Sequence, residues 1–408
     1  MTATILAIDG IAPASRAAPS SREELAGALQ EADAKGLAVA PVGGGTQLHL
    51  GMPPARLDLV IDTTRLSRVV EYEPADLTVT AEAGLAFVEL QKQLAEQGQF
   101  LALDPPAAPG ATLGGLIATN ASGPLRFAYG TARDLVIGTR VANPDGTVTH
   151  AGGRVVKNVA GYDLNKLYIG SLGTLGIIVE LSFKLAPIPP ATNTIIGRFS
   201  SFGAAQGILG AVVHSPLAPL AIELLGARAA AGAALPEAAL VVFRVGGYPQ
   251  AVERQVRDLS ALLGEHGGQR VDATDSVWDD LSGMFVAAQS RDVVVKAAVP
   301  IVESTRSVEI LERRLAALDP QVWAHAGNGV AFAACNAPSD PTLLRELRAE
   351  VTALGANASL VIERCPTALK SALDVWGDPG SSLGLMRAVK AKLDPRHTLN
   401  PGRYVGGI

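Results

Sequence analysis

The sequence of 408 residues is poor in the residue types that carry metal, disulfide or nucleic-acid chemistry. Its only cysteines, Cys335 and Cys365, exclude a disulfide framework, a Cys-rich zinc site and a four-thiolate iron–sulfur cluster within the chain. Aromatic residues make up 4%, the formal net charge is -5, and no long run of Lys and Arg occurs. This composition argues against binding to a phosphate backbone. We expect no metal and no nucleic-acid partner, so redox chemistry would need an organic cofactor.

We also expect no secretory signal and no membrane-spanning segment. The N-terminus has no basic start, and Asp9 follows a short apolar run, unlike a secretory signal. The most apolar tract, residues 208–245, is too interrupted to span a bilayer, because it contains His214, Pro216, Pro219, Glu223, Arg228 and Pro236. We therefore expect a cytoplasmic protein that reaches the inner membrane only through a partner.

What the chain does have is enough apolar surface for packed cores. Hydrophobic residues make up 48% and charged residues 18%, and the length exceeds the roughly 250 to 300 residues of a single core. Prolines 187, 189 and 190 suggest a boundary, so we predict a first domain at 1–188 and a second at 189–382. A C-terminal segment, 383–408, leaves the pattern of the second domain.

Both predicted domains mix helices and strands. A capping box from Ser21 to Glu24 opens a helix that stops at Gly36, and a turn at 143–146 joins two strands of a hairpin. Other expected elements of the first domain are a helix at 85–97 and strands at 37–42, 57–61, 69–72, 77–81 and 175–185. In the second domain we expect strands at 193–199, 221–225, 239–245 and 293–299, with helices at 204–213, 252–263 and 304–318. This order favours an antiparallel sheet with helices on one face.

A run of three glycines, Gly43 to Gly45 before Thr46, follows the strand at 37–42. Without side chains in the way, its N–H groups can converge on a phosphate. The run is neither a G-x-G-x-x-G fingerprint nor a P-loop, so taken alone it is better interpreted as a plain glycine turn.

Two later segments strengthen the phosphate interpretation. Residues 105–123 combine many small residues with Thr and Ser hydroxyls and an Asn amide, which suit the pyrophosphate, ribityl chain and ring edges of a flavin. Tight strand crossing explains such a polar loop less well. A further segment runs from Lys157, Asn158 and Gly161 to Gly173 and Gly176, where the chain can turn closely against a ligand before an apolar strand.

Three motifs, in this order, carry a resemblance to a known family: PVGGGT, TLGGLIATNASG with YGTARD, and GYDLNKLYIGSLGTLGIIVE. They resemble the FAD-binding domain shared by vanillyl-alcohol oxidases, D-lactate dehydrogenases and glycolate oxidase flavoproteins. The chain is most similar to the FAD-binding subunits of glycolate oxidases, through to the terminal LDPRHTLNPGR. The resemblance implies an α+β chain: a PCMH-type FAD-binding domain of two subdomains, an α+β cap domain with an antiparallel sheet, and a C-terminal segment that returns to the FAD site.

The same resemblance implies FAD contacts residue by residue. Gly43, Gly44, Gly45 and Thr46 would hold the pyrophosphate, beside Pro41 and Gln47. The second loop would line the pyrophosphate, ribityl chain and ring edge through Pro105, Thr112, Gly114, Gly115, Thr119, Asn120, Ser122, Gly123, Gly130, Arg133 and Asp134. The adenine half would lie near Gly173, Thr174, Gly176 and Ile178, and the C-terminus would contribute Asn400 and Arg403. Arg403 is also compatible with an ordinary surface arginine.

One departure from the family concerns catalysis. Related 2-hydroxy-acid dehydrogenases have a glycine-rich turn between two histidines, and the second faces the flavin ring. Here His325 and the turn are present, but Phe332 occupies the position of the second histidine. Phenylalanine cannot accept the hydroxyl proton that leaves when a 2-hydroxy acid is oxidised. His325 and Arg403 remain as weak catalytic candidates.

The remaining reactive side chains favour structural roles. His49 follows the first glycine loop, where covalent attachment of FAD is conceivable, but an ordinary loop histidine is the better interpretation. The other four histidines, at 150, 214, 266 and 397, lack metal-ligand spacing. We expect both cysteines to lie in strands as inert core residues.

Three functions stay open at this point. The resemblance favours an FAD-binding subunit of a multisubunit glycolate oxidase, which converts glycolate to glyoxylate and works beside a catalytic flavoprotein subunit and an iron–sulfur subunit. The first alternative is a self-sufficient FAD-dependent dehydrogenase of a D-lactate-like 2-hydroxy acid. The second is a non-catalytic assembly subunit whose FAD is structural or absent.

Overall fold

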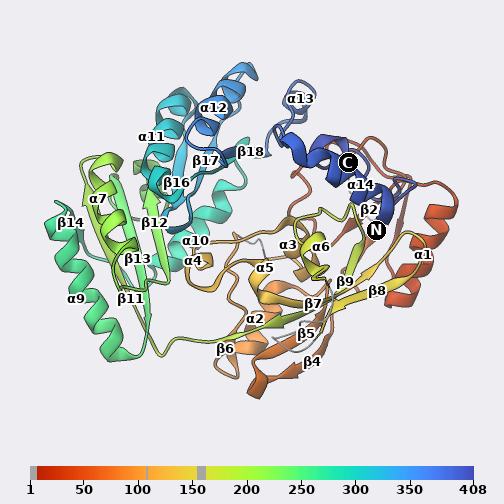
Figure 1. Ribbon diagram of the computed structural model, residues 1–408, viewed down its shortest axis with the longest axis horizontal. Helices are drawn as coiled ribbons and strands as arrows, with labels where there is room; N and C mark the ends of the chain where they lie inside the picture. The colour runs from red at the N-terminus through yellow and green to blue at the C-terminus, as the bar shows by residue number, and fades with distance from the viewer. Residues whose placement is uncertain (1–6, 107–108, 154–161) are drawn as a thin grey trace. The chain divides into compact units, whose positions relative to one another are not determined.

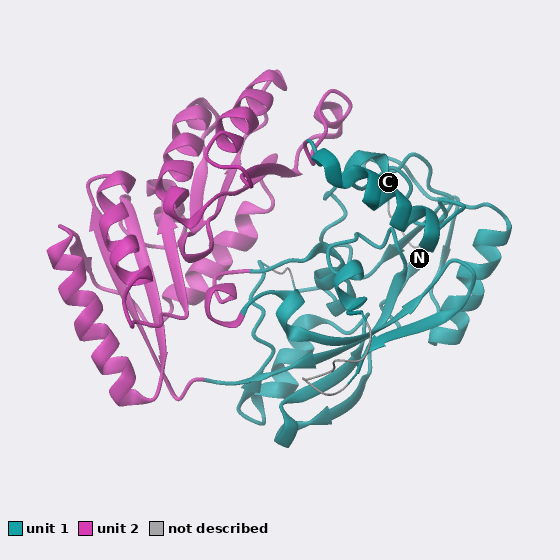
Figure 2. Ribbon diagram, viewed as in Figure 1, with its two compact units in different colours: residues 1–122, 130–188, 378–408 teal, residues 123–129, 189–377 magenta. Residues whose placement is uncertain are grey.

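The computed structural model describes residues 7–106, 109–153 and 162–408, which divide into two compact units (Figures 1 and 2). Unit 1 comprises residues 1–122, 130–188 and 378–408, and unit 2 comprises residues 123–129 and 189–377. This division differs from the predicted one in two places: residues 123–129 belong to unit 2, and the C-terminal segment of unit 1 begins at 378. Lys157, Asn158 and Gly161, at the start of the third segment, lie outside the described residues.

Unit 1 begins with a small parallel sheet and its helix. The strands β1 (Ser15–Ala17), β3 (Leu59–Asp62) and β2 (Val39–Val42) pair in that order. Helix α1 (Arg22–Ala34) starts at Ser21, whose side chain accepts a bond from the N–H of Glu24. The Glu24 carboxylate returns to the N–H of Ser20 rather than to that of Ser21, so the predicted capping box is only half formed.

A five-stranded antiparallel sheet forms the other half of unit 1. Its order is β4 (Val69–Glu73), β5 (Thr78–Glu82), β9 (Ile177–Lys184), β7 (Val136–Ala142) and β8 (Val148–Gly152). The predicted hairpin is confirmed, because β7 pairs with β8 around the turn at Asn143. Around the sheet lie α2 (Phe87–Ala95), β6 (Gln99–Phe100), β10 (Ala186–Pro187), α3 (Leu113–Thr119), α5 (Ala132–Leu135) and α6 (Asn165–Tyr168).

One hydrophobic core joins the two sheets of unit 1 to the end of the chain. Leu25 and Leu29 of α1 pack with Ile61 of the small sheet, with Val179 of the large sheet and with Leu399. Leu399 also forms an isolated parallel β-bridge with Val39 of β2, at the edge of the small sheet. The C-terminal segment, which contains α14 (Leu383–Leu393), is therefore built into the first half of the chain.

Unit 2 is an eight-stranded antiparallel sheet. Its order is β14 (Gln269–Val271), β11 (Ala191–Phe199), β13 (Ala239–Gly247), β12 (Ala221–Leu225), β16 (Gln321–His325), β17 (Val330–Cys335), β15 (Val293–Ala298) and β18 (Ser359–Arg364). Every pairing in it is antiparallel. The α+β class and the antiparallel second sheet are thus confirmed.

The helices of unit 2 cover both faces of this sheet, so the prediction of helices on one face is wrong. Helices α8 (Ala227–Gly232) and α10 (Val277–Ala288) share a core with Trp323 and Phe332. A second set of helices contacts the strands outside that core: α7 (Phe202–Val213), α9 (Pro249–Glu265), α11 (Ser304–Leu315) and α12 (Thr342–Thr352). Two short helices, α4 (Arg126–Tyr129) and α13 (Thr367–Lys370), complete the unit.

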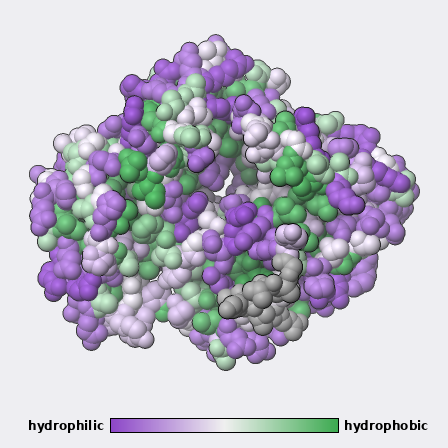
Figure 3. Space-filling view, viewed as in Figure 1, coloured by the Kyte–Doolittle hydropathy of each residue, from purple (hydrophilic) through white to green (hydrophobic). Residues whose placement is uncertain are grey.

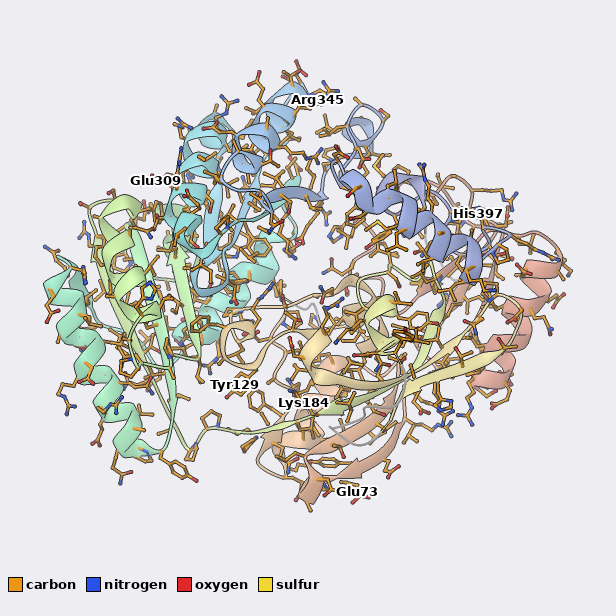
Figure 4. The ribbon with its side chains drawn as sticks, viewed as in Figure 1. Glu73, Tyr129, Lys184, Glu309, Arg345 and His397 are labelled. Carbon is orange, nitrogen blue, oxygen red and sulfur yellow. The ribbon has the colours of Figure 1, made fainter. Side chains whose placement is uncertain are left out.

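Contacts between helices tie the second set together. The carboxylate of Glu309 on α11 accepts a bond of 2.8 Å from the N–H of Gly203 at the start of α7 (Figure 4).

On the face drawn in Figure 3, hydrophobic residues are interspersed with hydrophilic ones. Among the residues that the structure describes, no helix combines the length and the apolar character needed to cross a bilayer.

Candidate functional site

The first glycine loop lies where β2 ends, and its glycines are required by contact with a second loop. A Cβ atom on Gly44 would stand 1.6 Å from the carbonyl oxygen of Gly110, and one on Gly43 would stand 2.1 Å from Oγ1 of Thr112. Gly45 has a φ of +71°, which favours glycine. The first two glycines therefore let two backbone segments meet, in addition to any approach to a ligand.

The second loop leads into α3, whose first turn borders the same cleft as the first glycine loop. Thr112 caps this helix, because its Oγ1 accepts a bond from the N–H of Gly115. A Cβ on Gly114 would stand 2.9 Å from the Cβ of Ala83, so glycine lets the helix lie directly on the end of β5. The hydroxyl of Thr119 donates back to the carbonyl of Gly115.

The third loop is anchored to α3 and to β2. The N–H of Leu172 donates to the carbonyl of Ala118, and a Cβ on Gly173 would stand 2.6 Å from Cγ of Pro41. Leu172 has a φ of +51°, in the left-handed region that side chains other than glycine rarely adopt. Its bonds hold this strained residue in place.

The C-terminal segment, although distant in sequence, forms a further wall of this cleft. Asn400 is 4% exposed, its Nδ2 donates to the carbonyl of Leu172 at 2.7 Å, and its Oδ1 has no protein partner. Arg403 is 5% exposed and donates to the carbonyls of Leu48 and Leu50. This burial excludes an ordinary surface arginine, and it lowers the pKa of Arg403 to about 10.

These four segments surround one cleft in unit 1, with an empty volume of about 780 Å³ counting its open mouth. It is lined by predicted contact residues from all four: Pro41, Gly43, Gly44, Gly45, Thr46, Gln47, Thr112, Gly114, Gly115, Thr119, Gly173, Gly176, Ile178, Asn400 and Arg403. The lining also includes residues that were not among the predicted contacts: Val42, Leu48, Thr63, Ala118, Leu172 and Ile177. Thr63 follows β3 beside the end of β2, and the shared edge of two parallel strands is the signal that could have found it.

Eight predicted contact residues do not line this cleft: Pro105, Asn120, Ser122, Gly123, Gly130, Arg133, Asp134 and Thr174. Two of them, Asp134 and Thr174, have structural roles. Asp134 accepts bonds from the N–H and hydroxyl of Thr131 and so caps α5. The hydroxyl of Thr174, which is fully buried, donates to the carbonyl of Ser171. Gly123 falls in unit 2, and His49 is not among the lining residues either.

The cleft fits a neutral to anionic organic cofactor. Arg403 is the only charged residue among the lining residues that the structure describes, and none of them is Asp or Glu. Backbone N–H groups and Thr hydroxyls suit a pyrophosphate, and the buried Oδ1 of Asn400 can accept a bond from a bound ligand.

A second feature, within unit 2, is a buried pair of titratable side chains. His325 and Glu223 are direct cross-strand neighbours on β16 and β12, and Nδ1 of His325 lies 2.8 Å from Oε2 of Glu223. Their exposed fractions are 3% and 0%. Burial raises the pKa of Glu223 well above its usual value. The pair is therefore built to hold a proton between the two groups.

Aromatic side chains enclose this pair. Phe332 lies edge-on to the His325 ring at a centroid distance of 5.2 Å, and Phe285 does so at 5.8 Å. Phe332, the position that the resemblance assigns to a second histidine, is thus part of the apolar core of unit 2.

The two cysteines are buried, as expected for core residues. Cys335 lies in β17, where burial raises the pKa of its thiol to about 12. Cys365 directly follows β18 rather than lying within it. A thiol with so high a pKa is a poor nucleophile at neutral pH.

Two family models match stretches of the chain that contribute to this cleft. Residues 13–152 match the family model described as an FAD binding domain, and residues 379–404 match the C-terminal domain of FAD linked oxidases. These stretches contain the first two glycine loops and the C-terminal residues Asn400 and Arg403. The chain is an FAD-linked oxidoreductase.

Relatives of this FAD-linked oxidoreductase include several dehydrogenases and oxidase subunits. The mitochondrial D-lactate dehydrogenase (cytochrome) of Arabidopsis thaliana is 29% identical over 95% of this chain and 72% of its own. Glycolate oxidase subunit GlcD of Bacillus subtilis is 26% identical over 95% of this chain and 87% of its own. Glycolate oxidase subunit GlcE of Escherichia coli is 36% identical, but over 44% of this chain and 50% of its own.

The fold of this oxidoreductase is that of PCMH-type flavoproteins. A structure of p-cresol methylhydroxylase with substrate bound matches 96% of this chain and 88% of its own, with a TM-score of 0.75 and 16% identity. The predicted fold class is therefore confirmed. The predicted cofactor, FAD, is confirmed by the two family models and by the glycolate oxidase relatives.

Proposed function

We propose that this chain is the FAD-binding subunit of a multisubunit glycolate oxidase, which converts glycolate to glyoxylate and passes electrons to partner subunits. The observation that carries the proposal is the place of Phe332, which packs into the core of unit 2. The resemblance assigns this position to a histidine in related 2-hydroxy-acid dehydrogenases. A chain without that proton acceptor is better suited to work beside a catalytic subunit. The GlcE and GlcD relatives support this assignment.

In this proposal the cleft of unit 1 holds FAD, and unit 2 is the cap or substrate-type domain. The glycine loop at 43–45 and the first turn of α3 would bind the pyrophosphate through backbone N–H groups. Asn400 would accept a bond from the cofactor through its Oδ1, and Arg403 would hold the loop at Leu48 in place. When bound, FAD supplies a two-electron acceptor for oxidation of an alcohol carbon.

Electron transfer beyond the flavin would require other chains. The two cysteines are both buried, and four thiolates are needed for an iron–sulfur cluster of the usual kind. We therefore assign the cluster to a separate iron–sulfur subunit and glycolate oxidation to a catalytic flavoprotein subunit. Any position at the inner membrane would follow from that complex.

The test is to purify the chain alone and together with its co-expressed neighbours. Alone, it should carry FAD, seen in its absorbance spectrum, but should reduce dye with glycolate at least a hundredfold more slowly than the complex. Vigorous glycolate-dependent dye reduction by the isolated chain would rule out the subunit role. A colourless chain that restores activity to the complex would instead indicate an assembly subunit.

A self-sufficient 2-hydroxy-acid dehydrogenase is the second candidate, and the buried pair of His325 and Glu223 favours it. The D-lactate dehydrogenase relative, which aligns over most of the chain, points the same way. In this case His325 would act as the base, and H325A would abolish turnover of D-lactate by the isolated chain. Normal turnover by H325A would count against this role.

A further inference from the structure

Lys390, in α14 of the C-terminal segment, is a buried charge with a complete set of partners. It is 1% exposed, and its Nζ donates to the carbonyl of Thr174 at 2.8 Å, to the carbonyl of Leu399 at 2.9 Å and to Oδ2 of Asp394 at 2.6 Å. An ammonium group has three N–H donors, so these bonds use all of them. One side chain thus joins the third loop, at Thr174, to two points of the C-terminal segment.

Asp394 organises the turn that follows α14. It is fully buried, and its carboxylate accepts bonds from the N–H groups of Thr398 at 2.9 Å and Leu399 at 2.8 Å. The turn wraps around the carboxylate, with His397 exposed at a φ of +55° (Figure 4). The pair of Lys390 and Asp394 is therefore satisfied by backbone groups as well as by opposite charge.

Both ends of this network reach the cofactor cleft. Thr174 directly follows Gly173, and Leu399 directly precedes Asn400. Gly173 and Asn400 both line the cleft. Asn400 also donates to the carbonyl of Leu172, and its N–H donates to the carbonyl of Val39 in β2. The ammonium of Lys390 therefore bonds to the neighbours of Gly173 and Asn400, which belong to two different walls of the cleft.

A buried ion pair of this kind contributes little to net stability, because desolvation of both charges offsets their attraction. Burial also lowers the pKa of Lys390, in line with that cost. We therefore attribute the ion pair of Lys390 and Asp394 to geometry. Apolar contacts are not directional and could not hold two carbonyl groups at a defined separation, whereas hydrogen bonds from one ammonium group can.

We propose that Lys390 is a positioning residue for the cofactor: it sets the spacing between Gly173 and Asn400 before FAD binds. The inference rests on FAD binding in the cleft of unit 1. It requires no contact between Lys390 and FAD, and it makes the C-terminal segment a preformed wall of the cleft rather than a flap that FAD draws in.

The test uses the full chain with its FAD removed, titrated with FAD while flavin fluorescence is followed. The variant K390M alone would leave Asp394 as an uncompensated buried charge, so the main variant is K390M/D394N, which removes both charges at nearly constant volume. The matched control is K392M, at an exposed lysine on the same helix. Melting temperature without FAD reports stability separately from affinity.

We expect K390M/D394N to melt below the wild-type temperature, because the carbonyls of Thr174 and Leu399 lose their donor, and in its folded form to bind FAD at least tenfold more weakly. K392M should match the wild type in both respects. Wild-type affinity in a folded K390M/D394N would overturn the proposal. If the wild-type chain itself bound no FAD, the cofactor site would be wrong, which is a separate result.

A second measurement needs no variant. Hydrogen exchange of the wild-type chain should show the amides of Leu399 and Asn400 protected to a similar degree with and without FAD. Rapid exchange of both amides without FAD, followed by protection when FAD is added, would show that the cofactor orders the segment and would overturn a preformed wall.

Discussion

Phe332 stacks face to face on Trp323, with ring centroids 5.2 Å apart and ring planes 11° apart. The two residues are direct cross-strand neighbours on β17 and β16. Stacked aromatic pairs of this kind stabilise a fold by about 0.5 to 1.5 kcal/mol beyond the area they bury. A position that the sequence marks as the loss of a base is therefore a packing position in the core of unit 2.

Truncation of this ring should destabilise unit 2 without emptying the cofactor cleft. We expect F332A to lower the free energy of unfolding by about 3 to 5 kcal/mol, the usual cost of removing a buried phenylalanine. Chemical denaturation followed by Trp fluorescence measures the loss. FAD content per folded chain should stay at the wild-type level, because Phe332 belongs to unit 2 and the cleft to unit 1; parallel loss of FAD would contradict this separation.

Glu223 should make stability depend on pH. In the unfolded chain its carboxyl ionises near the ordinary pKa of 4.5, whereas burial holds the pKa of the folded state well above that value. Between the two pKa values the folded state binds more protons, so the free energy of unfolding should fall as the pH rises above about 4.5.

The matched variants for this slope are E223Q and E237Q. Gln at 223 keeps a bond to His325 without a titratable group, so E223Q should show a flatter pH profile than the wild type. Glu237 is exposed, and E237Q should retain the wild-type slope. Equal slopes for wild type and E223Q, measured by denaturation at several pH values, would mean that the carboxyl is not the group that titrates.

Two glycine-to-alanine changes should affect different properties: G44A should weaken FAD binding, and G27A should stabilise the chain. In G44A the new Cβ would meet the carbonyl of Gly110 at 1.6 Å, so the two loops must separate, and we expect at least a tenfold weaker affinity for FAD. In G27A the Cβ enters open space on helix α1, where alanine should stabilise the chain by about 0.5 to 1 kcal/mol. Fluorescence titration with FAD and thermal melting distinguish the two, and unchanged FAD affinity in G44A would exclude contact between these loops.

Cys335 should be unreactive in the folded chain. Its side chain is buried and its thiol has a pKa of about 12, so almost no thiolate exists at pH 8. A maleimide reagent at that pH should leave Cys335 unlabelled for hours and label it within minutes after denaturation, as read by peptide mass spectrometry. Fast labelling of the native protein would show that this strand opens.

Local patterns in the sequence were sufficient for many of the elements. The strand predicted at 221–225 is β12 with the same bounds, and the turn at Asn143 joins the predicted hairpin. These elements depend on periodicity and turn chemistry within a few residues. By contrast, α8 and α10 were not predicted, and they cover the second face of the sheet. Which face of a strand a helix covers depends on packing between distant segments.

The sequence by itself determined the class of cofactor, because three glycine-rich motifs in a set order are local features that a single chain displays. Only the tertiary structure decided which residues share a site. Glu223 meets His325 across 102 positions of sequence, and Asn400 meets Leu172 across 228, through strand register and a returning C-terminal segment. Such pairs leave no local periodicity, since they are set by the packing of cores that form only when the whole chain has folded.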